Sequence, residues 1–252
     1  ITRSKTRLAN FFEHYLFISS IEPMKVEEAL EDPDWINAMQ KELHNFERNQ
    51  VCTLVEKLNN NHNIIGTKWV FHNKQDEDGQ VIRNKARLVT QGYTQVEGMD
   101  YGETYTSVAR LESIHYANHH DITLNLMDIK SAFLNGENEE EDYVKQPPGF
   151  VNPKKPDHVY KLHNALYGLK QAPRVWYKCL TKFLIEKGFE IGKIDSTLFT
   201  KRVNGELFVC QIYVDDIIFG STSPHFSEKF GKLMSEKFEI SMMSELKFFL
   251  GL

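Results

Sequence analysis

Two adjacent aspartates, Asp215 and Asp216, lie between apolar, β-prone runs at residues 209–214 and 217–219. This pattern predicts a tight hairpin with both aspartates at its tip. A carboxylate beside buried strands is costly unless its charge is compensated, and hard cations such as Mg²⁺ prefer oxygen ligands. A pair of such ions can activate an attacking oxygen and stabilise a leaving one in phosphoryl transfer. The competing interpretation is an ordinary Asp-Asp turn on a surface hairpin.

A third carboxylate favours the metal hypothesis. Asp128 lies within another strand-like segment, residues 124–134. A two-metal site needs ligands from more than one turn of the chain. Asp128 completes the site if its strand lies beside the predicted hairpin.

Several longer motifs occur in a fixed order along the chain, and a known family carries the same order. In sequence they read MDIKSAFLNG, YVKQPPGF, ALYGLKQAPRVWY and QIYVDDIIFGST, with IIGTKWVF and NKARLVTQGYTQ before them and ELKFFLGL after them. The chain therefore resembles the reverse transcriptase of copia-type long-terminal-repeat retrotransposons, within the Pol polyprotein. The resemblance covers nearly all of the chain from about Glu22 onward.

The resemblance implies an RNA-directed DNA polymerase with three catalytic carboxylates, Asp128, Asp215 and Asp216. Two Mg²⁺ ions, with Mn²⁺ as an alternative, would be held by Asp128 and Asp215. Asp216 would support the charge and geometry of this pair, and Tyr213 would shape the primer end. The expected partners are an RNA or DNA template with its primer, and deoxynucleoside triphosphates.

The resemblance also implies six nucleotide-binding residues: Lys85, Arg87, Phe133, Tyr167, Gly168 and Lys170. Lys85 and Arg87 are two apart on a predicted strand, so they share one face, although such a pair is more often simply solvated. By this resemblance Phe133 would be the steric gate, an aromatic ring that packs where a ribose 2′-hydroxyl would lie and so favours deoxynucleotides. The alternative for Phe133 is a core phenylalanine.

Composition gives weaker constraints. The chain has 252 residues, 41% hydrophobic and 26% charged, and its formal net charge is −5. These values are ordinary for a globular protein and show no bulk basic character. From residue 145 to 193, however, ten lysines and arginines stand among only three acids, which suggests a local basic face that could follow a phosphate backbone. A solvated helix face explains the same pattern.

The three cysteines are far apart and odd in number, which favours a reducing compartment over a disulfide framework. No apolar run is long enough to span a bilayer, so we expect no membrane partner. The resemblance implies an intracellular location in cytoplasmic virus-like particles. The chain begins at Ile1 and ends at Leu252 just after an apolar run, so we expect both ends to be cuts in a longer product that also carries integrase and RNase H.

The predicted elements are mixed. Residues 1–21 are predicted to be a tail or linker, followed by a helix from Asp32-Pro33 to about Asn49 and by a hairpin whose strands are 64–71 and 81–90, with its turn at Asp78-Gly79. Further elements are a helix at 110–120, the Asp128 strand, a helix from Pro173 closed by Gly188, a meander from 197 to about 219 with a turn at Asn204-Gly205, and a helix from Ser223-Pro224.

Apolar residues at helical spacing predict which side of each long helix is buried. The predicted stripes are Trp35, Met39, Leu43 and Phe46 on the first helix, Trp176, Leu180, Phe183 and Leu184 on the helix from Pro173, and Phe226, Phe230, Leu233 and Phe238 on the last.

This order predicts an α+β fold, an antiparallel sheet with helices packed on one face. By resemblance it is the fingers and palm of a right-hand polymerase with the thumb largely absent. Residues 22–252 would form the reverse transcriptase domain, with about 50–110 like fingers and about 111–252 mainly palm. The helix predicted at 110–120 is about four residues shorter than in the family. The alternative hypothesis is therefore a truncated, inactive remnant, which folds and binds nucleic acid without polymerising.

Overall fold

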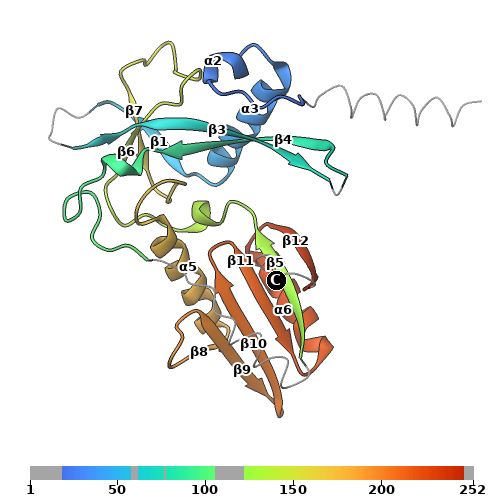
Figure 1. The fold of residues 1–252 in the computed structure, drawn as a ribbon. Helices are drawn as coiled ribbons and strands as arrows, with labels where there is room; N and C mark the ends of the chain where they lie inside the picture. The colour runs from blue at the N-terminus through green and yellow to red at the C-terminus, as the bar shows by residue number, and fades with distance from the viewer. Residues whose placement is uncertain (1–18, 58–61, 77, 106–121, 247–252) are drawn as a thin grey trace, which may run out of the picture. The chain divides into compact units, whose positions relative to one another are not determined.

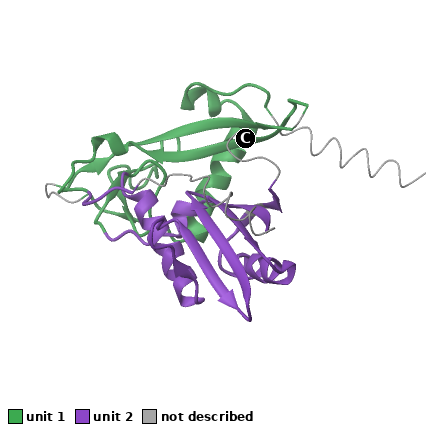
Figure 2. Cartoon of the chain, turned by 60° about the horizontal axis from the view of Figure 1, so that its bottom comes forward, with its two compact units in different colours: residues 1–100, 140–169 green, residues 101–139, 170–252 purple. Residues whose placement is uncertain are grey.

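The computed structural model describes residues 19–57, 62–76, 78–105 and 122–246 (Figure 1). The chain divides into two compact units (Figure 2). Unit 1 comprises residues 1–100 and 140–169, and unit 2 comprises residues 101–139 and 170–252. Each unit mixes helices and strands, so the predicted α+β class is confirmed at this level.

The two units differ from a division at about residue 110 in two respects: unit 2 begins at residue 101, and residues 140–169 belong to unit 1. Residues 140–169 return to unit 1 because their strands, β6 (Tyr143–Lys145) and β7 (Val159–Leu162), pair with strands of that unit. β7 lies between β6 and β1 (Cys52–Val55), and β6 pairs in parallel with β2 (Ile64–Ile65), which completes a four-stranded sheet.

The long helix of unit 1 begins and ends as the sequence predicts. After the short helix α2 (Val26–Ala29), α3 spans Pro33–Arg48. The Asp32 side chain caps it by accepting a hydrogen bond from the Asp34 amide at 2.9 Å, and proline follows the cap, where its missing N–H costs nothing. Its buried stripe includes Trp35, Met39 and Phe46, as the helical spacing predicts.

A two-stranded antiparallel ribbon is the second main feature of unit 1. It consists of β3 (Thr67–Gln75) and β4 (Val81–Thr90). The predicted return strand is confirmed, whereas the first predicted strand, 64–71, is broken at Gly66 into β2 and β3, which belong to different sheets. A 3₁₀ turn, η1 (Gly92–Thr94), follows the ribbon.

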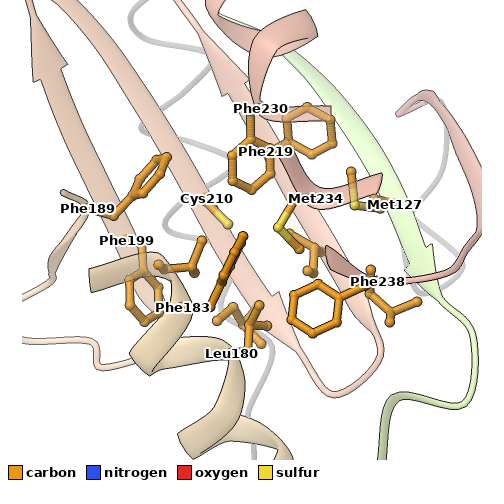
Figure 3. Close-up of a cluster of buried hydrophobic side chains, with 14 of the residues drawn as sticks. Met127, Leu180, Phe183, Phe189, Phe199, Cys210, Phe219, Phe230, Met234 and Phe238 are labelled. Atoms are coloured by element: carbon orange, nitrogen blue, oxygen red, sulfur yellow. The ribbon is translucent and has the colours of Figure 1, made fainter. Parts of the chain in front are cut away.

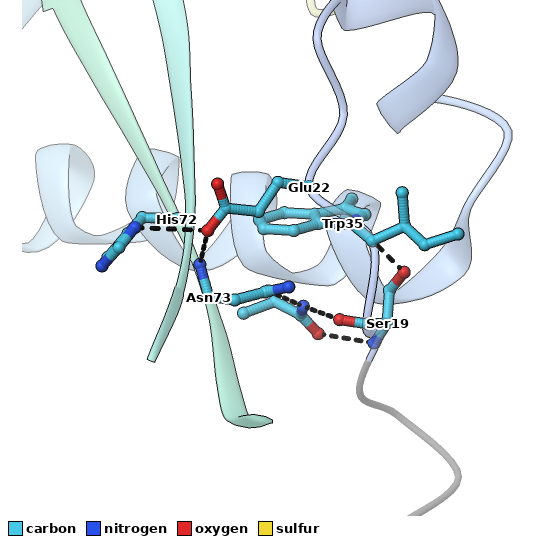
Figure 4. A network of polar contacts seen from close by, with 7 residues as sticks. Ser19, Glu22, Trp35, His72 and Asn73 are labelled. Atoms are coloured by element: carbon cyan, nitrogen blue, oxygen red, sulfur yellow. Dashed lines mark hydrogen bonds and ion pairs between the residues drawn. The ribbon is translucent and has the colours of Figure 1, made fainter. Parts of the chain in front are cut away.

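The end of the predicted tail is tied to the ribbon and to α3 (Figure 4). The Ser19 amide donates to Asn84 Oδ1 at 2.9 Å, and Asn84 Nδ2 donates back to the Ser19 carbonyl at 2.7 Å. Trp35 Nε1 donates to the Ile21 carbonyl at 3.0 Å. Ser19 and Ile21 therefore belong structurally to unit 1, although the sequence placed them with the tail.

Unit 2 is built on a six-stranded sheet of order β12-β5-β11-β10-β9-β8, in which every neighbouring pair is antiparallel. Its strands are β5 (Thr123–Ile129), β8 (Glu190–Ile191), β9 (Leu198–Val203), β10 (Glu206–Tyr213), β11 (Asp216–Ser221) and β12 (Ile240–Glu245). The predicted β9-β10-β11 meander is confirmed. Its helical elements are η2 (Ala132–Asn135), α5 (Ala172–Glu186) and α6 (Pro224–Lys237).

One face of this sheet packs against α5 and α6 in a shared core (Figure 3). The predicted stripe of α5 is confirmed, since Trp176, Leu180, Phe183 and Leu184 are all buried. On the sheet, the core residues alternate with residues of the opposite face, as in any strand with one face on a core. They are Met127, Ile129, Phe199, Phe208, Cys210, Ile212, Ile217 and Phe219.

The prediction for the last helix is less accurate. α6 ends at Lys237, so Phe238 caps the helix and lies outside it. Met234, which the predicted stripe omitted, is fully buried, whereas Phe226 and Leu233 are only partly buried. Methionine fills irregular gaps among bulky aromatics because its side chain is flexible.

The predicted basic face is corrected by the structure, and the helix predicted at 110–120 is not tested by it. The lysine- and arginine-rich stretch from 145 to 193 does not form one face of one unit, because it is divided between unit 1 and unit 2. Two of its lysines form ion pairs, Lys161 with Glu141 and Lys178 with Glu139. The helix predicted at 110–120 lies outside the described residues. Within the described ranges, no helix is long and apolar enough to cross a membrane.

Candidate active site

The β10–β11 turn has an unusual backbone. Tyr213 pairs with Asp216, so the two turn residues are Val214 and Asp215, and Asp216 already belongs to β11. The prediction that both aspartates form the tip is therefore corrected by one residue. Val214 has a φ of 55°, a left-handed conformation that is strained for a β-branched residue.

Two hydrogen bonds hold this turn in place. Trp176 Nε1, from the buried face of α5, donates to the Val214 carbonyl at 2.6 Å. The amide of Ile129 donates to the Asp215 carbonyl at 3.0 Å, which joins the turn to the end of β5. The turn is therefore braced both from the core and from the neighbouring strand.

Strand pairing brings the third carboxylate to the same place. In the β11–β5 register, Asp216 lies directly opposite Asp128, as expected if the Asp128 strand lies beside the hairpin. Ile217 and Ile129 face the core, so Asp216 and Asp128, one residue away in each strand, point to the opposite face. Tyr213, adjacent to the buried Ile212, lies on this face as well.

The three carboxylates influence one another electrostatically. Burial, then the charges of Asp215 and Asp128, raise the pKa of Asp216 to about 6. Both effects disfavour the ionised form of a carboxyl group. Asp216 is therefore harder to ionise than an isolated aspartate.

This charge has a measurable cost in stability. Because the folded pKa of Asp216 is raised, the destabilisation is absent below about pH 4, develops as the pH rises towards 6, and is complete above it. Without divalent metal, Asp216→Asn should raise the free energy of unfolding at pH 8 by about 1 kcal/mol, a value reduced for solvent screening because the group is half-exposed. In thermal denaturation this corresponds to a rise of about 2–4 °C in Tm.

The comparison with pH 3.5 supplies the control for that measurement. There the variant and the unaltered chain should unfold at nearly the same temperature, because Asp216 is neutral in the folded chain and mostly neutral in the unfolded chain. A stabilisation of equal size at both pH values would show that the aspartate charge is not its cause.

The three carboxylates suit an Mg²⁺ ion that is bound together with a substrate. All three side chains offer oxygen, which hard cations prefer, and the charges of Asp215 and Asp128 both act on Asp216. Within the described residues, however, no three His, Cys, Asp or Glu side chains are already arranged as a metal cluster. Mg²⁺ is commonly held by one or two carboxylates together with substrate phosphates, without a complete protein cage, so Asp128 and Asp215 suit it in the presence of a nucleotide.

The strand predicted over 124–134 ends at Ile129, and Phe133, five residues after Asp128, lies on the 3₁₀ turn η2 instead. Ser131, just before this turn, has a φ of 49°, and Asn135 Nδ2 donates to the Ser131 carbonyl at 3.2 Å. The turn rests on α5 through Cys179, whose thiol lies 3.3 Å from the Asn135 carbonyl. Phe133 itself is half-buried at the rim of the unit 2 core, which leaves the roles of gate and core residue both open.

A second group of predicted site residues lies within unit 1. The guanidinium of Arg87 is 4.7 Å from the centre of the Tyr167 ring, a cation–π arrangement. Gly168 follows, with a φ of 95°, and a Cβ there would lie 2.2 Å from the Thr90 carbonyl. Only glycine fits this position without displacing backbone, so the glycine allows the Tyr167 loop to pack closely on the end of β4.

Lys85 and Lys170 complete the predicted set. Lys85 is half-buried on β4, and burial together with the neighbouring Arg87, Lys74 and Arg83 lowers its pKa. Lys170 is exposed in the loop before α5. The boundary between the units falls between residues 169 and 170, so unit 1 contains Lys85, Arg87, Tyr167 and Gly168, and unit 2 contains Lys170, Phe133 and the carboxylates.

The sequence did not indicate two residues that shape the carboxylate turn. Trp176 was predicted only as a core residue, and the sequence gives no sign that its indole nitrogen reaches the turn. Val214 was predicted only as a strand residue. A β-branched residue immediately before an Asp-Asp pair carries no signal of a left-handed backbone, because the conformation is imposed by its neighbours.

The antiparallel sheet of unit 2 carries Asp128 and Asp216 on the face opposite its helices, with Asp215 in the adjoining turn. This arrangement suits the class of nucleotidyl-transferring polymerases, and sequence comparison identifies the family. Residues 49–252 match the model of the family described as reverse transcriptase (RNA-dependent DNA polymerase). The chain belongs to this family.

Pol polyproteins of copia-type retrotransposons are among the similar proteins. The chain is 36% identical over 235 residues to the retrovirus-related Pol polyprotein from transposon RE1 of Arabidopsis thaliana, covering 92% of the chain and 16% of that protein. It is 33% identical over 248 residues to the polyprotein from transposon TNT 1-94 of Nicotiana tabacum, covering 95% of the chain and 19% of that protein. The chain thus spans less than a fifth of these relatives.

A solved structure is similar at lower identity. The foamy viral protease-reverse transcriptase in complex with double-stranded DNA has 13% identity and a TM-score of 0.47, with 86% of this chain and 33% of that chain covered.

Proposed function

We propose that this chain is the catalytic core of an RNA-directed DNA polymerase, which adds deoxynucleotides to a primer 3′-hydroxyl on an RNA or DNA template. The observation that carries the proposal is the register that sets Asp216 opposite Asp128, with Asp215 in the braced turn beside them. The charges of Asp215 and Asp128 both act on Asp216, which supports the proposal, because two-metal phosphoryl transfer needs several oxygen ligands close together.

In this proposal Asp128 and Asp215 hold two Mg²⁺ ions. When bound, these ions lower the pKa of the attacking hydroxyl and neutralise charge on the leaving pyrophosphate. Asp216 supplies negative charge beside this pair, and Tyr213, on the same face, orients the primer end. The protein's contribution is positioning and charge, with no covalent step on a side chain.

We propose further that unit 1 corresponds to the fingers and unit 2 to the palm of a right-hand polymerase, with the thumb largely outside this chain. On unit 1, Lys85 and Arg87 would bind the triphosphate, and Tyr167 and Gly168 would contact the incoming nucleotide. On unit 2, Lys170 and Phe133 are the proposed nucleotide-binding residues. The remaining polyprotein would supply integrase and RNase H.

Primer extension tests the proposal directly. The assay uses a DNA primer on an RNA template, Mg²⁺ and deoxynucleotides, with this chain and with a longer chain that continues past residue 252. Extension by either chain, abolished by EDTA, is the expected result. Folded protein without extension from both chains would overturn the proposal and favour the inactive remnant.

Phe133 gives a separate prediction about sugar selection. If its ring is the gate, Phe133→Ala should reduce discrimination against ribonucleotides by at least about tenfold, or about 1.4 kcal/mol. The measurement is the ratio of kcat/KM for a deoxynucleotide and its ribonucleotide. Phe226→Ala removes another half-buried ring from the rim of the same core and should leave this ratio unchanged. Equal ratios in all three proteins would show that Phe133 is a core residue and does not act as a gate.

A further inference from the structure

Unit 1 contains a cavity that has no part in the proposed reaction. Its volume is about 720 Å³, and all of its lining residues belong to unit 1. They come from α3, from β4, from three strands of the four-stranded sheet and from the loop between β6 and β7. Sites for small molecules commonly have volumes of about 300–1,000 Å³, so this cavity is large enough to hold one.

One wall of the cavity is a face of the four-stranded sheet. The register sets Val144 opposite Tyr160 and Tyr160 opposite Leu54, and Cys52 lies two residues before Leu54 on β1. Residues directly opposite one another, and residues two apart on a strand, share a face of the sheet. Cys52, Tyr160 and Val144 therefore point the same way, and all three line the cavity together with Phe46 of α3.

The loop between β6 and β7, which forms another wall, is held by the buried side chain of Gln146. Its Nε2 donates to the carbonyls of Lys155 and His158, both at 2.9 Å. Its Oε1 accepts from the amide of Asn152 at 2.8 Å. The wall is therefore formed before any ligand binds, which reduces the entropy lost on binding.

Two hydrogen-bond donors in the cavity are available to a ligand. Within the part of the chain that the structure describes, neither the Cys52 thiol nor the Tyr160 hydroxyl has a hydrogen-bond partner. Burial, followed by the charge of Glu47, raises the pKa of the Cys52 thiol to about 12, and burial also raises the pKa of Tyr160. Both groups stay neutral donors at neutral pH, and the same surroundings disfavour a bound anion.

The charged residues of the lining do not favour an ion of either sign. Lys145, Lys154 and Glu47 are exposed, and exposed charges contribute little to binding. Most of the other lining side chains are aliphatic, aromatic or proline. We propose that this cavity binds an uncharged aromatic molecule that carries a hydrogen-bond acceptor, such as a carbonyl, for Tyr160 or Cys52.

The cavity also reaches the residues next to two proposed nucleotide contacts. Leu88 and Leu166 line it, and in the chain they directly adjoin Arg87 and Tyr167, whose side chains stack at 4.7 Å. A ring packed against these leucines would shift the backbone that carries the stacked pair. Occupancy should therefore weaken nucleotide binding, a consequence that rests on the proposed function.

Fluorine NMR of the full chain with 4′-fluorobiphenyl-4-carboxamide measures binding directly. This probe is uncharged and has one carbonyl acceptor, and the corresponding carboxylate and amidine have the same shape with a negative or a positive charge. We expect the Kd of the amide to be at least about tenfold lower than that of either analogue, because burying an unpaired charge is costly. A charged analogue that binds as tightly as the amide would overturn the proposal.

Cys52 reports where the probe binds. Native protein is treated with N-ethylmaleimide, and modification of each cysteine is followed by peptide mass spectrometry. With the amide at about ten times its Kd, modification of Cys52 should slow by about tenfold, because about one molecule in ten remains without probe. Cys179 of unit 2 should react at an unchanged rate. Binding of the amide without protection of Cys52 would overturn the proposal.

A pair of neighbouring variants tests the same location. Cys52→Phe fills part of the cavity with a ring and should weaken binding of the amide by at least about tenfold. Thr53→Phe is the matched control, because it places the same ring on the other, exposed face of β1. It should change Kd by no more than about twofold. Equal weakening in both variants, or none in Cys52→Phe, would overturn the proposal.

A second pair serves if Cys52→Phe does not fold. Val151 lines the cavity and is 46% exposed, whereas Val96 is 51% exposed, also in unit 1, and outside the cavity. Val151→Trp should narrow the opening and weaken binding of the amide by at least about tenfold, and Val96→Trp should leave it unchanged. Unchanged binding by both would overturn the proposal.

Primer extension separates this inference from the proposed function. With the amide at about ten times its Kd, the KM for a deoxynucleotide should rise by at least about threefold with kcat unchanged. The same addition should have no effect on Cys52→Phe. Binding of the amide by a chain that shows no extension would contradict only the proposed function. Extension with an unchanged KM at full occupancy would contradict only the predicted effect on nucleotide binding.

Discussion

Asp215→Asn should abolish Mg²⁺-dependent primer extension, with a loss of about 10³-fold or more, which corresponds to about 4 kcal/mol of transition-state stabilisation. Asparagine keeps the size of the side chain and one oxygen but removes the charge that an Mg²⁺ ligand needs. The backbone carbonyl that accepts from the Ile129 amide is unaffected, so the turn should persist.

Stability should move in the opposite direction from activity. The Asp215 charge raises the pKa of Asp216, so removing it relieves repulsion and the Tm should be equal or higher. Steady-state extension and thermal denaturation of the same preparation separate the two effects. Glu190→Gln, at the exposed edge strand β8 of the same sheet, controls for charge alone and should retain full activity. Primer extension at the unaltered rate by Asp215→Asn would contradict the proposal that Asp215 is an Mg²⁺ ligand.

Substitution of Trp176 should reduce both stability and activity, because this residue lies in the core and also holds the turn that carries Asp215. Its side chain is 1% exposed and its ring meets Phe238 edge-on at 5.3 Å. Trp176→Ala should therefore cost about 3–5 kcal/mol of unfolding free energy. At about 2–4 °C per kcal/mol for a chain of this size, the fall in Tm should be about 6–20 °C in differential scanning calorimetry.

Trp176→Phe isolates the hydrogen bond from the packing. Phenylalanine fills much of the space but cannot donate to the Val214 carbonyl, and a buried acceptor left without a partner costs about 1–3 kcal/mol. The left-handed backbone at Val214 stores about 1–3 kcal/mol of strain, which the turn would then release by moving Asp215. We expect extension to fall by more than about tenfold, measured at a temperature where the variant is fully folded.

Trp35→Phe is the matched control. Trp35 is also fully buried, and its indole nitrogen donates to a backbone carbonyl, that of Ile21, at 3.0 Å. The loss of stability should be comparable, but this hydrogen bond holds the start of unit 1 and no catalytic turn. If Trp35→Phe and Trp176→Phe reduce extension equally, general destabilisation explains the loss, and the bracing role of Trp176 is wrong.

Local signals in the sequence were sufficient for most elements. Asp32-Pro33 predicted the start of α3, and the helical spacing of Trp176, Leu180 and Phe183 predicted the buried side of α5. The Asn204-Gly205 turn predicted the β9–β10 hairpin, because positive φ at both residues suits the twist of the paired strands. These features depend on residues within a few positions of one another, so the pattern contains the information.

Other features depend on residues far apart in the chain. Nothing local at Gly66 shows that β2 leaves the ribbon for another sheet, because its partner β6 lies almost 80 residues later. The return of residues 140–169 to unit 1 was missed for the same reason. The sequence predicted that Lys85 and Arg87 share one face of a strand. Only the register with β3 shows that Lys68 and Lys74 lie on the same face of the ribbon.

The sequence by itself determined the chemistry available to this protein: three aspartates in strand and turn contexts, in an order of motifs shared with reverse transcriptases. It determined these because residue type and short-range period are properties of the chain. Only the tertiary structure decided that Asp216 lies opposite Asp128 and that Trp176 braces the turn of Asp215. Pairing between strands 88 residues apart is fixed by the packing of the whole sheet on α5 and α6, where burial of the shared core selects one register.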